Sequence, residues 1–238
     1  MTAFVATRKR KCPEIPLLED YAVAPPEEFW SKFPYNGLPE KIECSINVPA
    51  LGKLIELNSN ILTECEIARA KTCITYLLLG ANSCQKVTLP ACHLENAKSS
   101  IKNGPEITDE VACWTKKKFV SGPFKNPPFN HFRVNPLMAI EQLTKVRPVL
   151  NVSLPRNNSF NDNVDENLIE KVKMSSARKF SYSLVKCGKG SIMSKFDMVD
   201  AYKNIPAPLQ DLRLQGFCWL SMFFVELRQI FGAKTAVL

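Results

Sequence analysis

The stretch that most constrains the fold is residues 191–206, where alternating apolar and polar side chains run directly into a short turn. A period of two is typical of a strand with one buried and one open face. This pattern predicts that Lys195 and Asp197 point to the open face. Asp200 is expected to cap the short turn that follows, which Pro206 ends. Asp197 could be a metal ligand presented by the strand, or a solvated acid near its end.

A second strand with two different faces is expected at residues 145–152 (KVRPVLNV). Alternation places Lys145 and Arg147 on one face, about 7 Å apart from twice the strand rise. Pro148, on the other face, cannot donate a hydrogen bond to a neighbouring strand, so the strand is expected at a sheet edge. The two cations could clamp a triphosphate, with Arg147 binding it in a bidentate manner. Alternatively, they could protect an open edge against aggregation.

The composition indicates a globular, basic protein. The chain has 238 residues, of which 45% are apolar, and a net charge of +8, which favours polyanionic partners such as nucleic acids. Its nine cysteines form no regular disulfide framework and no secretory signal is recognisable, so we expect an intracellular location, in the nucleus or the cytoplasm. The longest apolar run is too short to span a bilayer, and no membrane partner is expected. Cys84, Cys92 and His93 lack the paired spacing of a zinc site.

The chain divides into three regions by sequence pattern. Residues 1–30 combine a basic cluster with a proline-containing acidic stretch and are expected to be disordered or extended. Residues 31–105 are expected to be mainly helical, with one or two amphipathic helices between 51 and 80 that break at 58–60. Their role is not indicated by any motif. Residues 106–238 contain the motifs described below.

Several further elements are expected in the second half of the chain. A helix should begin at Thr108, because acidic residues follow it at the positive end of the helix dipole. Residues 121–128 are rich in glycine and proline and predict an irregular loop. A helix is expected at 177–187, ended by glycine. A β-hairpin is expected from runs at 212–219 and 222–226, although the intervening Leu-Ser pair does not favour a tight turn.

Three motifs, in this order and at this spacing, resemble the fingers and first palm motifs of reverse transcriptases from retroelements: KVRPVLN (145–151), FDMVDAYKNIP (196–206) and QIFGAKTA (229–236). Residues 119–163 look more like the reverse transcriptases of retrotransposons with a tyrosine recombinase (DIRS-like elements) than like retroviral ones. The resemblance covers residues 106–238. It implies an α+β fold: a partial polymerase right hand, with fingers and an incomplete palm, an antiparallel sheet and packed helices.

The resemblance also implies a chemistry, the joining of deoxynucleoside triphosphates (dNTPs) to a primer on an RNA or DNA template. Asp197 would be the first catalytic carboxylate and would bind the two Mg²⁺ ions of such a site. Lys145 and Arg147 would hold the incoming triphosphate. Asp200 and Ala201 would donate backbone N–H groups to the same phosphates.

Other residues of the motifs would contact the remainder of the nucleotide. Tyr202 would lie beneath the sugar and exclude a 2′-hydroxyl by its bulk, and so select deoxynucleotides. Phe231 and Gly232 would pack on the incoming nucleotide and the template base. Gln229 would assist at the same place.

One motif that such polymerases need is absent from these 238 residues: an aromatic residue, a variable residue and two aspartates. With one of the expected acids only, both metal positions lose ligands, which costs several orders of magnitude in rate. We therefore expect a truncated reverse transcriptase that does not polymerise by itself. The alternative is a non-catalytic protein that binds RNA or DNA through its basic surface.

Overall fold

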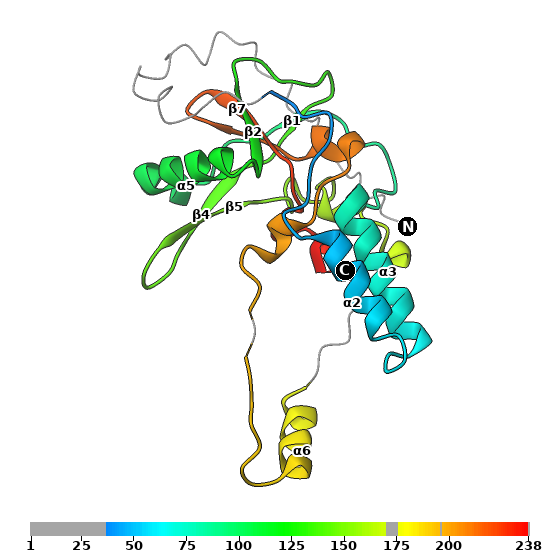
Figure 1. Cartoon of the computed structure of the whole chain (residues 1–238). Coiled ribbons are helices and arrows are strands. Elements are labelled where there is room, and N and C mark those ends of the chain that lie inside the picture. The colour runs from blue at the N-terminus through cyan, green and yellow to red at the C-terminus, as the bar shows by residue number, and fades with distance from the viewer. Residues whose placement is uncertain (1–36, 170–175, 196, 238) are drawn as a thin grey trace, which may run out of the picture.

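A five-stranded sheet forms the centre of the molecule (Figure 1). The computed structural model describes residues 37–169, 176–195 and 197–237. In spatial order, the strands are β1 (Cys92–His93), β3 (Arg133–Val134), β6 (Gly216–Trp219), β7 (Met222–Glu226) and β2 (Val120–Phe124). β1, β3 and β6 pair in parallel, whereas β6, β7 and β2 pair antiparallel. The predicted α+β class is confirmed. The sheet is mixed and not antiparallel throughout, because β3 pairs in parallel with β1 and with β6.

The second sheet is a hairpin of β4 (Leu137–Glu141) and β5 (Val146–Leu150). Its two strands pair antiparallel, with Arg147 opposite Ile140 and Pro148 opposite Ala139. Because this sheet has two strands, β5 is an edge strand, as its proline predicted. Its predicted faces are also confirmed, since Lys145 and Arg147 are exposed whereas Pro148 is buried.

Five α-helices occur in the described part of the chain. They are α2 (Val48–Leu57), α3 (Glu64–Leu79), α4 (Lys98–Lys102), α5 (Gly104–Lys116) and α6 (Ala177–Cys187). Short 3₁₀ turns are η2 (Asn161–Asn163), η3 (Glu166–Leu168), η4 (Ala201–Asn204), η5 (Leu209–Leu214) and η6 (Lys234–Val237). None of the helices within the described ranges is both long and apolar enough to cross a membrane.

The helices α2 and α3 pack side by side, and the predicted break between them is confirmed (Figure 1). Thr63 begins α3 with a capping box: its hydroxyl accepts a hydrogen bond from the Glu66 N–H, and the Glu66 carboxylate accepts one from the Thr63 N–H. The helix predicted at 177–187 is also confirmed as α6, with Ser176 as its cap and Gly188 at its end. It has no buried residue and lies apart from the sheet in Figure 1.

Two predicted element boundaries are wrong. The helix expected from Thr108 begins four residues earlier, at Gly104, because Pro105 suits the first turn of a helix. Residues 120–124, most of which were expected in a loop, form strand β2 against β7. Gly122 permits this pairing, since a Cβ atom there would lie 2.8 Å from the carbonyl oxygen of Phe223.

The predicted hairpin is confirmed as β6 and β7, although its first strand is shorter than expected. Leu212 and Leu214 lie in the 3₁₀ turn η5, and the strand begins at Gly216. Trp219 pairs with Met222, so the connection consists of Leu220 and Ser221. Both adopt left-handed backbone angles, with φ of 48° and 61°. Pairing and burial of the strands therefore override the poor turn propensity of these two residues.

The core lies on both faces of this hairpin. On one face, Phe217 and Phe224 stack with ring centroids 5.2 Å apart, in a cluster that also includes Val111 of α5. On the other face, Phe223 and Val225 join a second cluster. Alternation along β7 thus sends successive side chains into two cores, and both faces of the central sheet are covered.

Candidate functional site

A pocket of about 660 Å³ lies between the β4–β5 hairpin, α5 and the chain around η4. Seven of the nine residues expected to act on a nucleotide line it: Lys145, Arg147, Asp197, Asp200, Ala201, Tyr202 and Phe231. They come from the three separate motifs. The fold therefore brings together residues that are far apart in the sequence.

Two exposed cations of the pocket come from β5 and the residue just before it. Lys145 precedes this strand and Arg147 lies within it, and both side chains are exposed. Leu150, on the other face of β5, is buried in the main core cluster. Burial of that face fixes the register, because a slip of one residue would turn every side chain to the opposite side.

Asp197 lines the pocket, but not from the strand that its sequence pattern predicted. Residues 191–195 and 197–198 have no regular secondary structure, and their side chains are exposed; Phe196 lies outside the described residues. Strand backbone groups need a neighbouring strand as a hydrogen-bond partner. In the part of the chain that the structure describes, no strand pairs with this segment.

Asp200 begins the 3₁₀ turn η4 in a left-handed conformation, with φ of 50°. Its carboxylate makes no hydrogen bond to the turn, so the predicted side-chain cap is wrong. It instead accepts a hydrogen bond from Lys117 Nζ at 3.2 Å, and this bond raises the pKa of Lys117. Both side chains are about half exposed, so the ion pair contributes little stability. It does reduce the negative charge that Asp200 presents to the pocket.

Tyr202 and Phe231 form an aromatic wall. Their ring centroids lie 5.2 Å apart at an interplanar angle of 72°, in an edge-to-face arrangement. Tyr202 is half-buried, and Phe231 keeps 49% of its surface exposed. The wall thus offers an aromatic surface to a ligand in the pocket.

A buried ion pair, not anticipated from the sequence, also lines the pocket. Glu226 is only 2% exposed and pairs with Lys203, whose ammonium lies 4.5 Å from the ring centre of Trp114. Burial raises the pKa of the Glu226 carboxyl more than Lys203 lowers it. Its Oε1 atom has no hydrogen-bond partner. No sequence signal marks Glu226, since it ends an apolar strand whose other residues are core.

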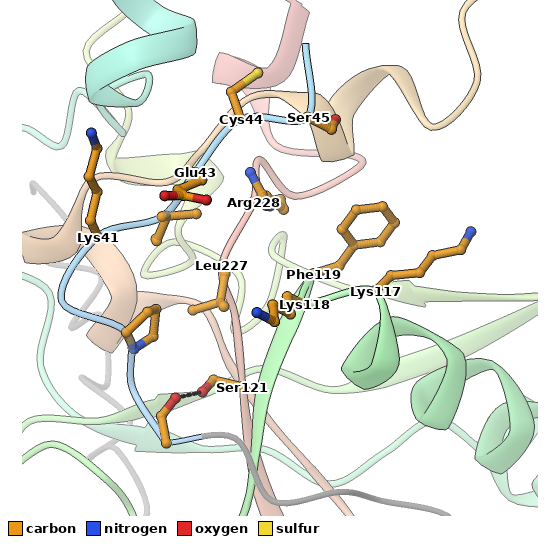
Figure 2. A pocket seen from close by; sticks show the side chains of 13 residues that line it. Lys41, Glu43, Cys44, Ser45, Lys117, Lys118, Phe119, Ser121, Leu227 and Arg228 are labelled. Carbon is orange, nitrogen blue, oxygen red and sulfur yellow. Dashed lines mark hydrogen bonds between the residues drawn. The ribbon is translucent and has the colours of Figure 1, made fainter. Parts of the chain in front are cut away.

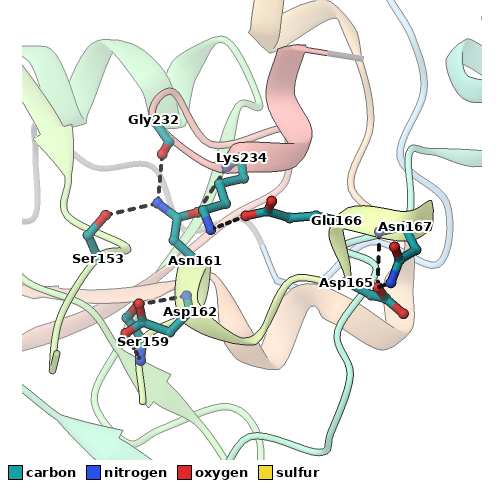
Figure 3. A network of polar contacts seen from close by, with 9 residues as sticks. All are labelled: Ser153, Ser159, Asn161, Asp162, Asp165, Glu166, Asn167, Gly232 and Lys234. Carbon is teal, nitrogen blue, oxygen red and sulfur yellow. Dashed lines mark hydrogen bonds and ion pairs between the residues drawn. The ribbon is translucent and has the colours of Figure 1, made fainter. Parts of the chain in front are cut away.

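The turn that carries Phe231 is fixed by Asn161 (Figure 3). The Asn161 side-chain amide donates hydrogen bonds to the Gly232 carbonyl and to Ser153 Oγ, both at 2.9 Å. Its Oδ1 atom accepts one from the Lys234 N–H, also at 2.9 Å. Asn161 therefore ties the end of the QIFGAKTA motif to the chain after β5.

The remaining two expected site residues have other neighbours. Gln229 is buried and donates a hydrogen bond from Nε2 to the Ala81 carbonyl, 2.5 Å away. Gly232 follows Phe231 with φ of 95° and accepts the hydrogen bond from Asn161. Neither residue lines the pocket.

We expect Asn161→Ala to lower the free energy of unfolding by about 3 kcal/mol, because three hydrogen bonds are lost and buried partner groups are left unsatisfied. Asn163→Ala is a matched control, since its amide makes one bond, to the Ser159 carbonyl. That variant should lose about 1 kcal/mol. Urea denaturation measures both values, and equal losses would show that Asn161 has no special role.

The described residues do not form a complete magnesium site. Within residues 37–169, 176–195 and 197–237, no group of three or more His, Cys, Asp or Glu side chains could hold a metal ion. Asp197 and Asp200 share the pocket, but Asp200 is paired with Lys117. Mg²⁺ generally needs octahedral oxygen ligands, with carboxylates completed by water and substrate phosphates. These side chains alone therefore do not fit a stably bound Mg²⁺.

No protein-family model and no curated protein matches this chain. Among solved structures, it is similar to native prototype foamy virus protease-reverse transcriptase, with a TM-score of 0.45, 10% identity, and coverage of 83% of this chain and 26% of that chain. It is also similar to the foamy viral protease-reverse transcriptase in complex with an RNA/DNA hybrid, with a TM-score of 0.45 and 16% identity. That match covers 85% of this chain and 27% of that chain. This chain spans about a quarter of those chains. Both TM-scores lie below 0.5.

Proposed function

We propose that this chain is the fingers and part of the palm of a reverse transcriptase, and that its pocket binds the triphosphate of an incoming dNTP beside an RNA or DNA template-primer. The observation that carries the proposal is the convergence of seven residues from three separate motifs on one pocket. Two cations, an aromatic wall and a carboxylate match the phosphates, the sugar and the metal ion of such a nucleotide.

The phosphates are assigned to the β5 side of the pocket. Arg147 is suited to bind two phosphate oxygens through its planar guanidinium, and Lys145 acts as a point charge. The backbone N–H groups of Asp200 and Ala201 add neutral donors at the start of η4. Because Lys117 pairs with the Asp200 carboxylate, repulsion of the triphosphate is reduced.

The sugar and base are assigned to the aromatic wall. Tyr202 acts as the steric gate against a 2′-hydroxyl, and Phe231 and Gly232 pack on the nucleotide, with Gln229 behind them in the core. Asp197 would supply one carboxylate ligand to a Mg²⁺ that arrives bound to the triphosphate. Since the aromatic-X-Asp-Asp motif is absent from these 238 residues, we expect nucleotide binding without DNA synthesis by these residues alone.

The alternative is that the protein binds RNA or DNA without recognising a mononucleotide. A net charge of +8 and three successive exposed lysines, at 116–118, favour it. In that case, oligonucleotides would bind in a salt-dependent manner, and mononucleotides would not bind.

The test is a calorimetric titration with the magnesium complexes of dGTP and GTP, which share the same base. We expect the wild-type chain to prefer dGTP and Tyr202→Ala to bind both about equally, because the bulk beneath the sugar is removed. Tyr182→Ala, on the exposed surface of α6, is the matched control and should keep the preference. An unchanged preference in Tyr202→Ala would refute the gate, and no binding of either triphosphate by the wild type would refute the proposed function.

A further inference from the structure

A second pocket, of about 540 Å³, lies on another part of the molecule (Figure 2). It is bounded by residues 37–45, by residues 117–121 and by Leu227 and Arg228 after β7. The Ser121 hydroxyl donates a hydrogen bond to the Gly37 carbonyl at 2.7 Å, which joins two of these walls. None of the nine residues expected to act on a nucleotide lines this pocket.

The central group of the second pocket is Arg228. Arg228 is only 6% exposed, and its Nε and Nη1 atoms have no hydrogen-bond partner. Its guanidinium carbon lies 5.9 Å from the ring centre of Phe119, and in the view of Figure 2 Arg228 lies between Phe119 and Glu43. A buried guanidinium with unsatisfied donors is costly, and such groups normally bind an anion or a carbonyl.

The other charged groups of the pocket favour an anion. Lys41 and Lys118 are exposed on its rim, and Lys117 lines it while pairing with Asp200. The one carboxylate among its described lining residues is Glu43. Burial lowers the pKa of the Arg228 guanidinium, and an added negative charge would offset that cost of burial.

The nearest acid in the sequence, Glu226, does not form an ion pair with Arg228. Glu226 lies two residues earlier, at the end of β7, and its carboxylate pairs with Lys203 and lines the first pocket. No ion pair between Arg228 and an acidic group occurs within the residues that the structure describes. Burial lowers the pKa of Arg228 more than the nearby Glu226 raises it. The lining of the second pocket holds Arg228 and three lysines against one carboxylate, that of Glu43.

We propose that the second pocket binds a phosphate group, with Arg228 as its hydrogen-bond donor and with Lys118 and Lys41 as point charges at the rim. A phosphate has several acceptor oxygens and carries more charge than a carboxylate when it is free, so it suits a pocket lined by a buried arginine and exposed lysines. The group could belong to a free phosphate or to the backbone of a nucleic acid. This inference does not depend on nucleotide binding in the first pocket.

The test measures binding of inorganic phosphate by calorimetry and binding of a fluorescent 12-nucleotide DNA single strand by anisotropy, both at low salt. Arg228→Met keeps an apolar stem but removes the donors, and Lys118→Gln removes an exposed charge. We expect Arg228→Met to weaken binding roughly tenfold or more, as the loss of a charge-assisted hydrogen bond does. Lys118→Gln should weaken it about threefold, as the loss of an exposed neighbouring charge does. Lys186→Gln, on α6, is the control with the same change of charge and should bind like the wild type.

The outcomes distinguish a free phosphate from the backbone of a nucleic acid as the ligand of this pocket. Weaker binding of inorganic phosphate by the variants identifies a free-phosphate site, and weaker binding of DNA alone identifies a nucleic-acid backbone site; either supports the inference. No binding of either probe by the wild type, or equal losses in Lys118→Gln and Lys186→Gln, overturns it. If circular dichroism shows that Arg228→Met does not fold, Lys118→Gln alone tests the inference. Lys118 is exposed, so its replacement should not disturb the fold. A Lys145→Ala/Arg147→Ala variant should still bind inorganic phosphate, which distinguishes this site from the first pocket.

Discussion

Replacing both Lys145 and Arg147 by alanine should weaken binding of a dNTP roughly 100-fold, because two charge-assisted contacts of about 1.5 kcal/mol or more each are lost. Both side chains are exposed and line the first pocket from the open face of β5. Their removal should leave the fold intact, with a change in the free energy of unfolding within about 0.5 kcal/mol. Titration with dGTP gives the affinity, and urea denaturation gives the stability.

The matched control for this prediction is the double variant Lys98→Ala/Lys125→Ala. It removes the same charge from exposed positions that line neither pocket described above. We expect it to lose less than about threefold in affinity, since neither side chain lines the pocket and salt screens exposed charges. If the two double variants lost affinity equally, net charge rather than the pocket would explain binding.

Phe224→Ala should lower the free energy of unfolding by about 4 kcal/mol. Phe224 is 0% exposed and stacks on Phe217 at 5.2 Å, so alanine would leave a large cavity between β7 and α5. A loss of this size is a large part of the 5–15 kcal/mol that is typical of a domain. Circular dichroism during urea denaturation measures it.

Two variants serve as controls for the core prediction. Phe224→Leu keeps most of the apolar volume and should lose less than half as much as alanine. Phe180→Ala, on the exposed surface of α6, should change the free energy of unfolding by less than about 0.5 kcal/mol. A similar loss for Phe224→Ala and Phe180→Ala would contradict the assignment of the core to the β6–β7 hairpin.

The sequence predicted the elements whose signal is local. The two faces of β5 follow from the alternation around Pro148, and the β6–β7 hairpin follows from two strand-forming runs. Capping and glycine signals predicted α6. These signals depend on neighbours within a few positions, and tertiary packing reinforces each of them.

The errors arose where distant contacts decide the conformation. Gly122 and Pro123 predicted a loop, yet pairing with β7 makes this segment a strand. The strand expected around Asp197 lacks a partner among the described strands. The pair Lys203 and Glu226, and the bonds of Asn161 to the Phe231 turn, join residues far apart in the chain, which no local pattern reveals.

Binding of a triphosphate in the first pocket is tested most directly by photo-crosslinking of a dNTP that carries a photoreactive group on its γ-phosphate, followed by mass-spectrometric mapping of the labelled peptides. We expect labelling of peptides that contain residues 145–151 or 197–203, suppressed by excess unlabelled dGTP and lost in the Lys145→Ala/Arg147→Ala variant. Competable labelling confined to residues 41–45 or 117–121, or labelling that unlabelled dGTP does not suppress, would contradict it.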